Sequence, residues 1–89
     1  MRRLFTTPRF EKRLAAFLDN HPTLLTDVQT VMQTIAENPR APALRTHRLS
    51  GTLAGCLAAR LAYEYRIVFV LAADRVTFID IGTHDDVYR

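Results

Sequence analysis

The 89-residue sequence has little cysteine and no long apolar run. Its single cysteine, Cys56, cannot form an internal disulfide, which is typical of proteins in a reducing cytoplasm. No apolar run approaches the roughly 20 residues that cross a bilayer. The first residues, MRRLFTTPRFEK, are basic but contain no apolar core, so we expect no signal peptide. The sequence therefore predicts a cytoplasmic protein with no membrane segment.

Two common kinds of binding site are also missing from the sequence. The three histidines and Cys56 lack the spacing of metal ligands. The segment GTLAG has neither the lysine nor the strand-to-helix context of a phosphate-binding loop. We therefore expect no metal and no cofactor.

Lysine is nearly absent, and arginine supplies almost all of the positive charge. There are eleven arginines and one lysine, Lys12, in a chain of net charge +3. Five of the arginines lie between Arg40 and Arg66, where Glu64 is the single acidic residue. Because the planar guanidinium suits bidentate phosphate contacts, this stretch indicates a surface for nucleic acid or an acidic partner. A solvated face with no ligand is the alternative.

The first half of the chain has the pattern of two short helices. Thr7 and Pro8 are typical of a helix start, and Pro22 can open a second helix that Asn38 and Pro39 end. Each segment carries one apolar stripe at helical spacing. The stripes are Phe10, Leu14, Phe17 and Leu18 in the first helix, and Leu24, Leu25, Val28, Val31, Met32 and Ile35 in the second.

The second half alternates with a period of two, which predicts strands around residues 56–62, 66–71 and 76–81. Residues 1–7 can form a short first strand, and residues 39–55 are expected to be a loop. With a length typical of one domain, 1–89, the elements predict an α+β fold in the order β-α-α-β-β-β. Both helices then cover one face of an antiparallel sheet. The other face carries Arg60 and Arg66, and small neighbours such as Ala58 would leave a concave floor around Arg60.

Three segments, HRLSGTLAG, ARLAYEYRIVFVL and FIDIGTHDDVYR, together resemble the YafQ-like branch of the RelE/ParE superfamily of type II toxins. The resemblance covers the last half of the chain, and the helical half matches by layout and by its TP-x-F start. It implies a small, curved antiparallel sheet with two N-terminal helices on one face. It also implies an endoribonuclease that cleaves mRNA on the ribosome by 2′-OH attack. The implied partners are the ribosome, mRNA and a cognate antitoxin that forms a hetero-oligomer with the toxin.

The resemblance also implies roles for five residues. Arg60 would stabilise the phosphate and its phosphorane, although YafQ itself has a histidine at the matching position. His84 and His47 would transfer protons, since imidazole can act as acid or base at neutral pH. Glu64 would act as a base or orient a histidine, or would simply be a turn residue. Tyr88 would stack on a base or lend its hydroxyl.

The remaining charged residues have less definite roles. Arg66 would contact phosphate or form a structural pair with Asp80 or Glu64, and Arg45 and Arg48 would bind RNA from the basic loop. The roles of Asp85 and Asp86 stay open. Ala58 departs from relatives that carry a polar or basic residue there.

Two other functions are compatible with the same fold. One is a gyrase-inhibiting toxin of the ParE type, and the other is an inactive homologue that binds an antitoxin. His47 and His84 favour the endonuclease, because ParE-like members generally lack the terminal catalytic histidine.

Overall fold

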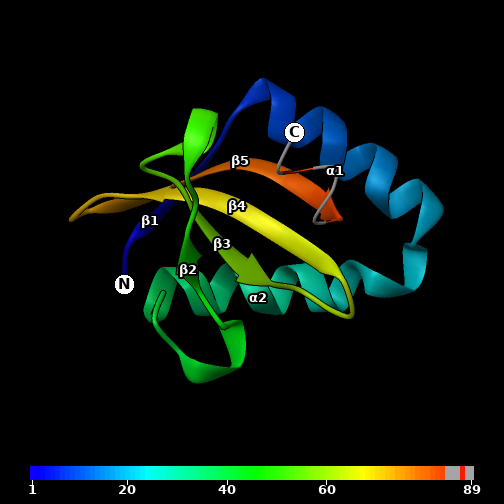
Figure 1. Cartoon of the computed structure of the whole chain (residues 1–89). Coiled ribbons are helices and arrows are strands. Elements are labelled where there is room, and N and C mark those ends of the chain that lie inside the picture. Colours follow the sequence, from blue (N-terminus) through cyan, green and yellow to red (C-terminus); the bar gives the residue numbers. More distant parts are fainter. Residues whose placement is uncertain (84–86, 88–89) are drawn as a thin grey trace.

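The computed structural model describes residues 1–83 and 87 (Figure 1). Strand β1 is followed by two helices, and the other four strands come after them. The helices are α1 (Pro8–Asn20) and α2 (Leu25–Glu37), joined by the short 3₁₀ helix η1 (Pro22–Leu24). The strands are β1 (Arg3–Thr6), β2 (His47–Arg48), β3 (Leu57–Arg60), β4 (Tyr65–Leu71) and β5 (Arg75–Thr83), with two more 3₁₀ helices, η2 (Pro42–Leu44) and η3 (Gly51–Leu53).

Helix α1 begins where the sequence predicts and α2 ends there, but Pro22 opens the 3₁₀ helix η1 and α2 begins only at Leu25. The Thr7 side chain caps α1 by accepting a hydrogen bond of 3.2 Å from the backbone N–H of Phe10, and Pro8 occupies the first turn. Helix α2 ends at Glu37, before Asn38 and Pro39, because the residue that precedes a proline is disfavoured in helical conformation. Phe10 of α1 and Ile35 of α2 are fully buried, so both apolar stripes face the core.

The five strands form one mixed sheet in the order β1-β5-β4-β3-β2. The meander β3-β4-β5 is antiparallel, and its order along the chain is as predicted. Two details differ from the prediction. Strand β1 pairs in parallel with β5, and residues 47–48, expected in a loop, add strand β2 at the far edge. The α+β fold class with both helices on one face is confirmed.

Each face of the sheet has an apolar cluster. On the helix side, Phe69 and Phe78 of the sheet pack with Phe10 and Ile35. The other face carries a smaller cluster of Leu49, Ala58, Val68 and Val87. We call this second face the outer face. Within the described residues, no helix is long and apolar enough to cross a membrane.

Candidate active site

Two arginines stand opposite each other on neighbouring strands of the outer face. Arg60 is the last residue of β3, Arg66 is the second residue of β4, and the two are direct cross-strand partners. Side chains of such partners lie on the same face, where like charges repel. Arg60 is exposed and Arg66 is half-buried. In the described part of the chain, neither guanidinium forms an ion pair with a carboxylate.

Strand β2 brings His47 to the same face. His47 is the cross-strand partner of Ala58, which lies two residues before Arg60 on β3. His47 is therefore a diagonal neighbour of Arg60, a relation that spans roughly 7–8 Å in sheets. Its Nδ1 lies 3.3 Å from the carbonyl oxygen of Arg45, a contact that helps to hold the ring. The structure thus brings His47, Arg60 and Arg66 together.

The floor beside Arg60 is not open, contrary to the expectation from its small neighbours. Ala58 is fully buried, because Leu49, Val68 and Val87 pack with it. Leu49 comes from the segment after β2, so its packing on Ala58 could not be predicted from the sizes of the residues along β3. The concavity is therefore filled at Ala58, and Arg60 stands at the rim of a small apolar cluster.

Glu64 lies in the turn that joins β3 to β4. The turn is closed by hydrogen bonds from Leu61 N–H to the Tyr65 carbonyl, 3.0 Å, and from Tyr65 N–H to the Ala62 carbonyl, 2.9 Å. Glu64 is exposed and forms no ion pair within residues 1–83 and 87. It is a turn residue, at the end of the ladder where Arg60 and Arg66 stand.

Asp80 does not pair with Arg66, although the sequence left that pairing open. A bulge interrupts β5: Val68 lies opposite Asp80, but the next residue of β4, Phe69, lies opposite Phe78. The extra residue re-aims the side chain of Asp80. The buried Asp80 carboxylate instead accepts hydrogen bonds from Arg13, 2.7 Å, and Arg9, 3.2 Å. Arg66 donates instead to the carbonyl oxygen of Tyr65, 3.1 Å.

The two other predicted RNA-binding arginines lie apart from this pair. Arg48 is consecutive with His47 in β2, so its side chain leaves the strand on the opposite face. There it lines a pocket together with Arg40, which the sequence marks only as part of the basic stretch. Arg45 is exposed in a left-handed conformation, with φ of 48°, just before β2.

Two of the predicted catalytic residues, His84 and Tyr88, lie outside the described residues. Asp85 and Asp86 do as well. The strand that leads to them is described: β5 continues through Gly82, the partner of Arg66, to Thr83. Gly82 is buried and contributes no side chain beside Arg66.

An aromatic cluster lies near the C-terminal end of α1. The rings of Phe17, His21 and Tyr65 lie between 4.8 and 5.0 Å apart, centroid to centroid. Tyr65 therefore packs against the end of α1. His21 is held by the same cluster, which makes it a useful comparison for His47.

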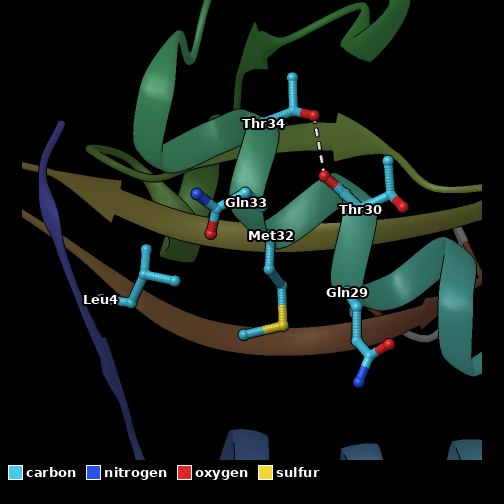
Figure 2. Close-up of a pocket in the computed structure, with 6 residues that line it drawn as sticks. All are labelled: Leu4, Gln29, Thr30, Met32, Gln33 and Thr34. Atoms are coloured by element: carbon cyan, nitrogen blue, oxygen red, sulfur yellow. Dashed lines mark hydrogen bonds between the residues drawn. The ribbon is translucent and has the colours of Figure 1, made fainter.

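A hollow of about 590 Å³ lies between β1 and α2. Figure 2 shows Met32 extending from α2 beside Leu4 of β1, and the Thr34 hydroxyl donating to the carbonyl oxygen of Thr30, 2.8 Å. None of the six lining residues is charged, so this hollow offers no group for acid, base or phosphate chemistry. No cluster of metal-ligating side chains occurs in the described part of the chain.

The architecture described above defines a class of fold: a small α+β fold like that of RelE, with two helices on one face of a five-stranded mixed sheet. Within this class, the chain is similar to YafQ from Escherichia coli strain BL21(DE3), with a TM-score of 0.84 over 100% of both chains at 15% identity.

Two further solved structures have the same fold. The YoeB/ParE toxin from Agrobacterium tumefaciens matches 92% of this chain and 98% of its own, with a TM-score of 0.77 and 18% identity. The toxin–antitoxin complex DinJ-YafQ from Escherichia coli matches 99% of this chain and 98% of its own, with a TM-score of 0.81 and 16% identity. No family model matches the sequence, and no curated protein does. The likeness therefore rests on the fold, and it confirms the fold expected from the sequence.

Proposed function

We propose that this chain is the toxin of a type II toxin-antitoxin system and that it cleaves mRNA on the ribosome. The observation that carries the proposal is the arginine pair. Arg60 and Arg66 are cross-strand partners on one face, and no carboxylate in the described residues neutralises either of them. An anion that binds between two such cations relieves their repulsion, and a scissile phosphate is such an anion.

The chemistry that suits this face is attack by the RNA's own 2′-hydroxyl on the neighbouring phosphorus. A bond forms between O2′ and phosphorus, and the bond from phosphorus to O5′ breaks. The products are a 2′,3′-cyclic phosphate and a free 5′-hydroxyl. A base takes the proton from O2′, and an acid gives one to O5′, so the protons balance. Arg60 and Arg66 stabilise the extra negative charge of the phosphorane between these two steps.

His47 is the described residue that fits the proton transfer, because it lies diagonally across from Arg60. By resemblance, His84 is the second proton-transfer group, and Tyr88 holds a base by stacking. By resemblance, Glu64 in the turn beside the two arginines orients a histidine or acts as the base. Arg45 adds positive charge next to His47 for the RNA backbone.

The proposed partners follow from the same reading. The ribosome presents the mRNA, and a cognate antitoxin binds the toxin as a hetero-oligomer in the cytoplasm. Solved structures of the same fold include the DinJ-YafQ and YoeB-YefM complexes, which supports a protein partner of this kind. A net charge of +3 suits an acidic antitoxin segment.

The test is to induce the wild type and the Arg60→Ala variant in bacteria and to map mRNA 5′ ends. We expect the wild type to arrest growth and to create new 5′-hydroxyl ends. Arg60→Ala should cleave about 10²–10³-fold more slowly, the usual effect of removing one group that stabilises a charged transition state. Lys12→Ala, which removes one exposed charge from α1, is the matched control and should cleave as the wild type does.

Three results would contradict the proposal. Growth arrest without new mRNA ends would reject the endonuclease. Arrest with DNA damage would instead favour the gyrase-inhibiting alternative. Cleavage by Arg60→Ala at the wild-type rate would remove Arg60 from the site while leaving the class of enzyme intact.

A further inference from the structure

A second basic feature lies at the opposite end of β3 from Arg60. It is a pocket of about 350 Å³ between the edge strand β2, the start of β3, the end of β4 and the turn after α2. This volume falls within the range of small-molecule sites. We call it the β2-edge pocket, and its lining residues are Arg40, Arg48, Leu49, Gly55, Cys56, Leu57 and Leu71.

The pocket carries two positive charges that no protein group neutralises. Arg40 and Arg48 are both exposed, and neither guanidinium forms an ion pair or hydrogen bond within residues 1–83 and 87. The sequence from residue 38 to residue 63 contains no aspartate or glutamate. Two guanidiniums at one pocket, with no acid between residues 38 and 63, suit an anion with several oxygens.

The floor of the same pocket is apolar. Leu57 is almost completely buried, with an exposed fraction of 7%, and Leu71 is half-buried beside it. At the wall, Gly55 has a left-handed φ of 93° and nothing lies within 4 Å of the place where a Cβ would be. A flat ring can lie against such a floor while its charged group reaches the arginines. This pairing of an apolar surface with two cations favours a nucleotide over a simple carboxylate.

The position of the pocket relates it to the arginine pair. His47 and Arg48 are consecutive in β2, so one side chain faces the outer face and the other faces the pocket. Leu57 and Arg60 mark the two ends of β3, which spans roughly 10 Å at 3.3 Å per residue. An RNA strand that passes over the sheet edge at β2 would therefore meet both sites.

We infer that the β2-edge pocket binds one nucleotide of single-stranded RNA. Arg40 and Arg48 hold its phosphate, and Leu57 and Leu71 contact its base or ribose. Binding at this pocket does not require cleavage, so it can be measured apart from the function proposed above.

The experiment uses the full chain and a short, fluorescent 2′-O-methyl RNA, which cannot be cleaved because it lacks the attacking hydroxyl. Arg48→Ala and Arg40→Ala should each weaken binding about tenfold, as for loss of a hydrogen bond to a charged group. Each should also reduce the slope of log affinity against log salt by about 0.7, the value for one phosphate contact on a single strand. Lys12→Ala removes the same charge from α1 and should change neither quantity to this extent.

Cys56 gives an independent reading, because this single cysteine lines the pocket. Its alkylation should slow several-fold with saturating adenosine 5′-monophosphate in the wild type, and not in Arg48→Ala. Equal effects of Arg48→Ala and Lys12→Ala on RNA binding would overturn the inference. So would protection of Cys56 by inorganic phosphate as strong as that by the nucleotide, or protection by a glutamate-rich peptide alone.

The two proposals fail in different ways. A wild-type chain that binds the RNA through Arg48 but creates no new mRNA ends would reject the endonuclease and keep the pocket. A chain that cleaves mRNA while Arg48→Ala binds RNA with wild-type affinity would reject the pocket and keep the endonuclease.

Discussion

Arg60 and Arg66 face each other directly across the β3–β4 ladder, and no carboxylate in the described part of the chain pairs with either. The nearest buried acid, Asp80, is held by Arg9 and Arg13 of α1. The outer face therefore carries two positive charges that repel each other. Without a bound ligand, removing one of these charges would stabilise the fold. Stability and function are expected to oppose each other at this pair.

Arg66→Gln should stabilise the fold while it weakens the activity. The change keeps a long polar side chain and removes the repulsion, which is worth about 0.2–1 kcal/mol for directly opposed like charges. The gain in the free energy of unfolding should shrink in 1 M salt, because salt screens the repulsion. Urea unfolding at low and high salt measures it. Lys12→Gln is the control, and a less stable Arg66→Gln protein at low salt would contradict the prediction.

His47→Gln should remove proton transfer but keep a group that can hydrogen-bond to the Arg45 carbonyl. We expect the cleavage rate to fall about 10²–10⁴-fold, the usual contribution of general acid–base catalysis. The pH–rate profile should also change shape, because the glutamine amide cannot act as an acid or a base. His21→Gln alters the histidine that packs on Phe17 and Tyr65, and its profile should keep the wild-type shape. Unchanged profiles in both variants would exclude His47 from the chemistry.

The two arginines that hold Asp80 should contribute unequally to stability. Arg13 donates the shorter bond, 2.7 Å, and its side chain is 33% exposed, whereas that of Arg9 is 62% exposed. Arg13→Ala should cost about 1–3 kcal/mol of unfolding free energy, because it strips a charged hydrogen bond from a buried carboxylate. Arg9→Ala should cost less than about 1 kcal/mol. Chemical denaturation of both variants measures the difference. Equal losses of unfolding free energy would show that bond length and exposure do not decide how much each arginine contributes.

Ala58→Lys should strongly destabilise the fold. Ala58 is fully buried among Leu49, Val68 and Val87, so a lysine there would be an unpaired charge in an apolar cluster. We expect the melting temperature to fall by more than about 10 °C, which corresponds to a loss of a few kcal/mol in a domain of this size. Ala54→Lys, at an exposed position in the same covering segment, is the control. A well-folded Ala58→Lys protein would mean that the covering segment opens readily.

Several features could be predicted from the sequence because they depend on local patterns. The cap at Thr7, the two apolar stripes and the alternation after Cys56 each lie within one element, and the structure has the helices and the meander that they predict. Arg60 and Arg66 could also be placed on one face, since a short turn joins their strands.

Other features depend on contacts between distant segments. The pairing of β1 with β5 joins residues about 70 positions apart, and β2 lies within a segment whose prolines and glycines gave no strand period. Asp80 could not be assigned to Arg13 without the bulge, because a regular strand would have turned its side chain to a different neighbour. The same holds for Leu49, which closes the floor at Ala58 from a predicted loop.

The sequence by itself thus determined which segments are helices and strands and which side of each is apolar, since hydrophobic spacing within one element decides both. The tertiary structure alone decided which charges are neutralised. It brought Arg9 and Arg13 to Asp80, and it left Arg60, Arg66, Arg40 and Arg48 without an acid in the described residues. The reason is that an ion pair depends on distance in space, which strand order and register set and which position along the chain does not.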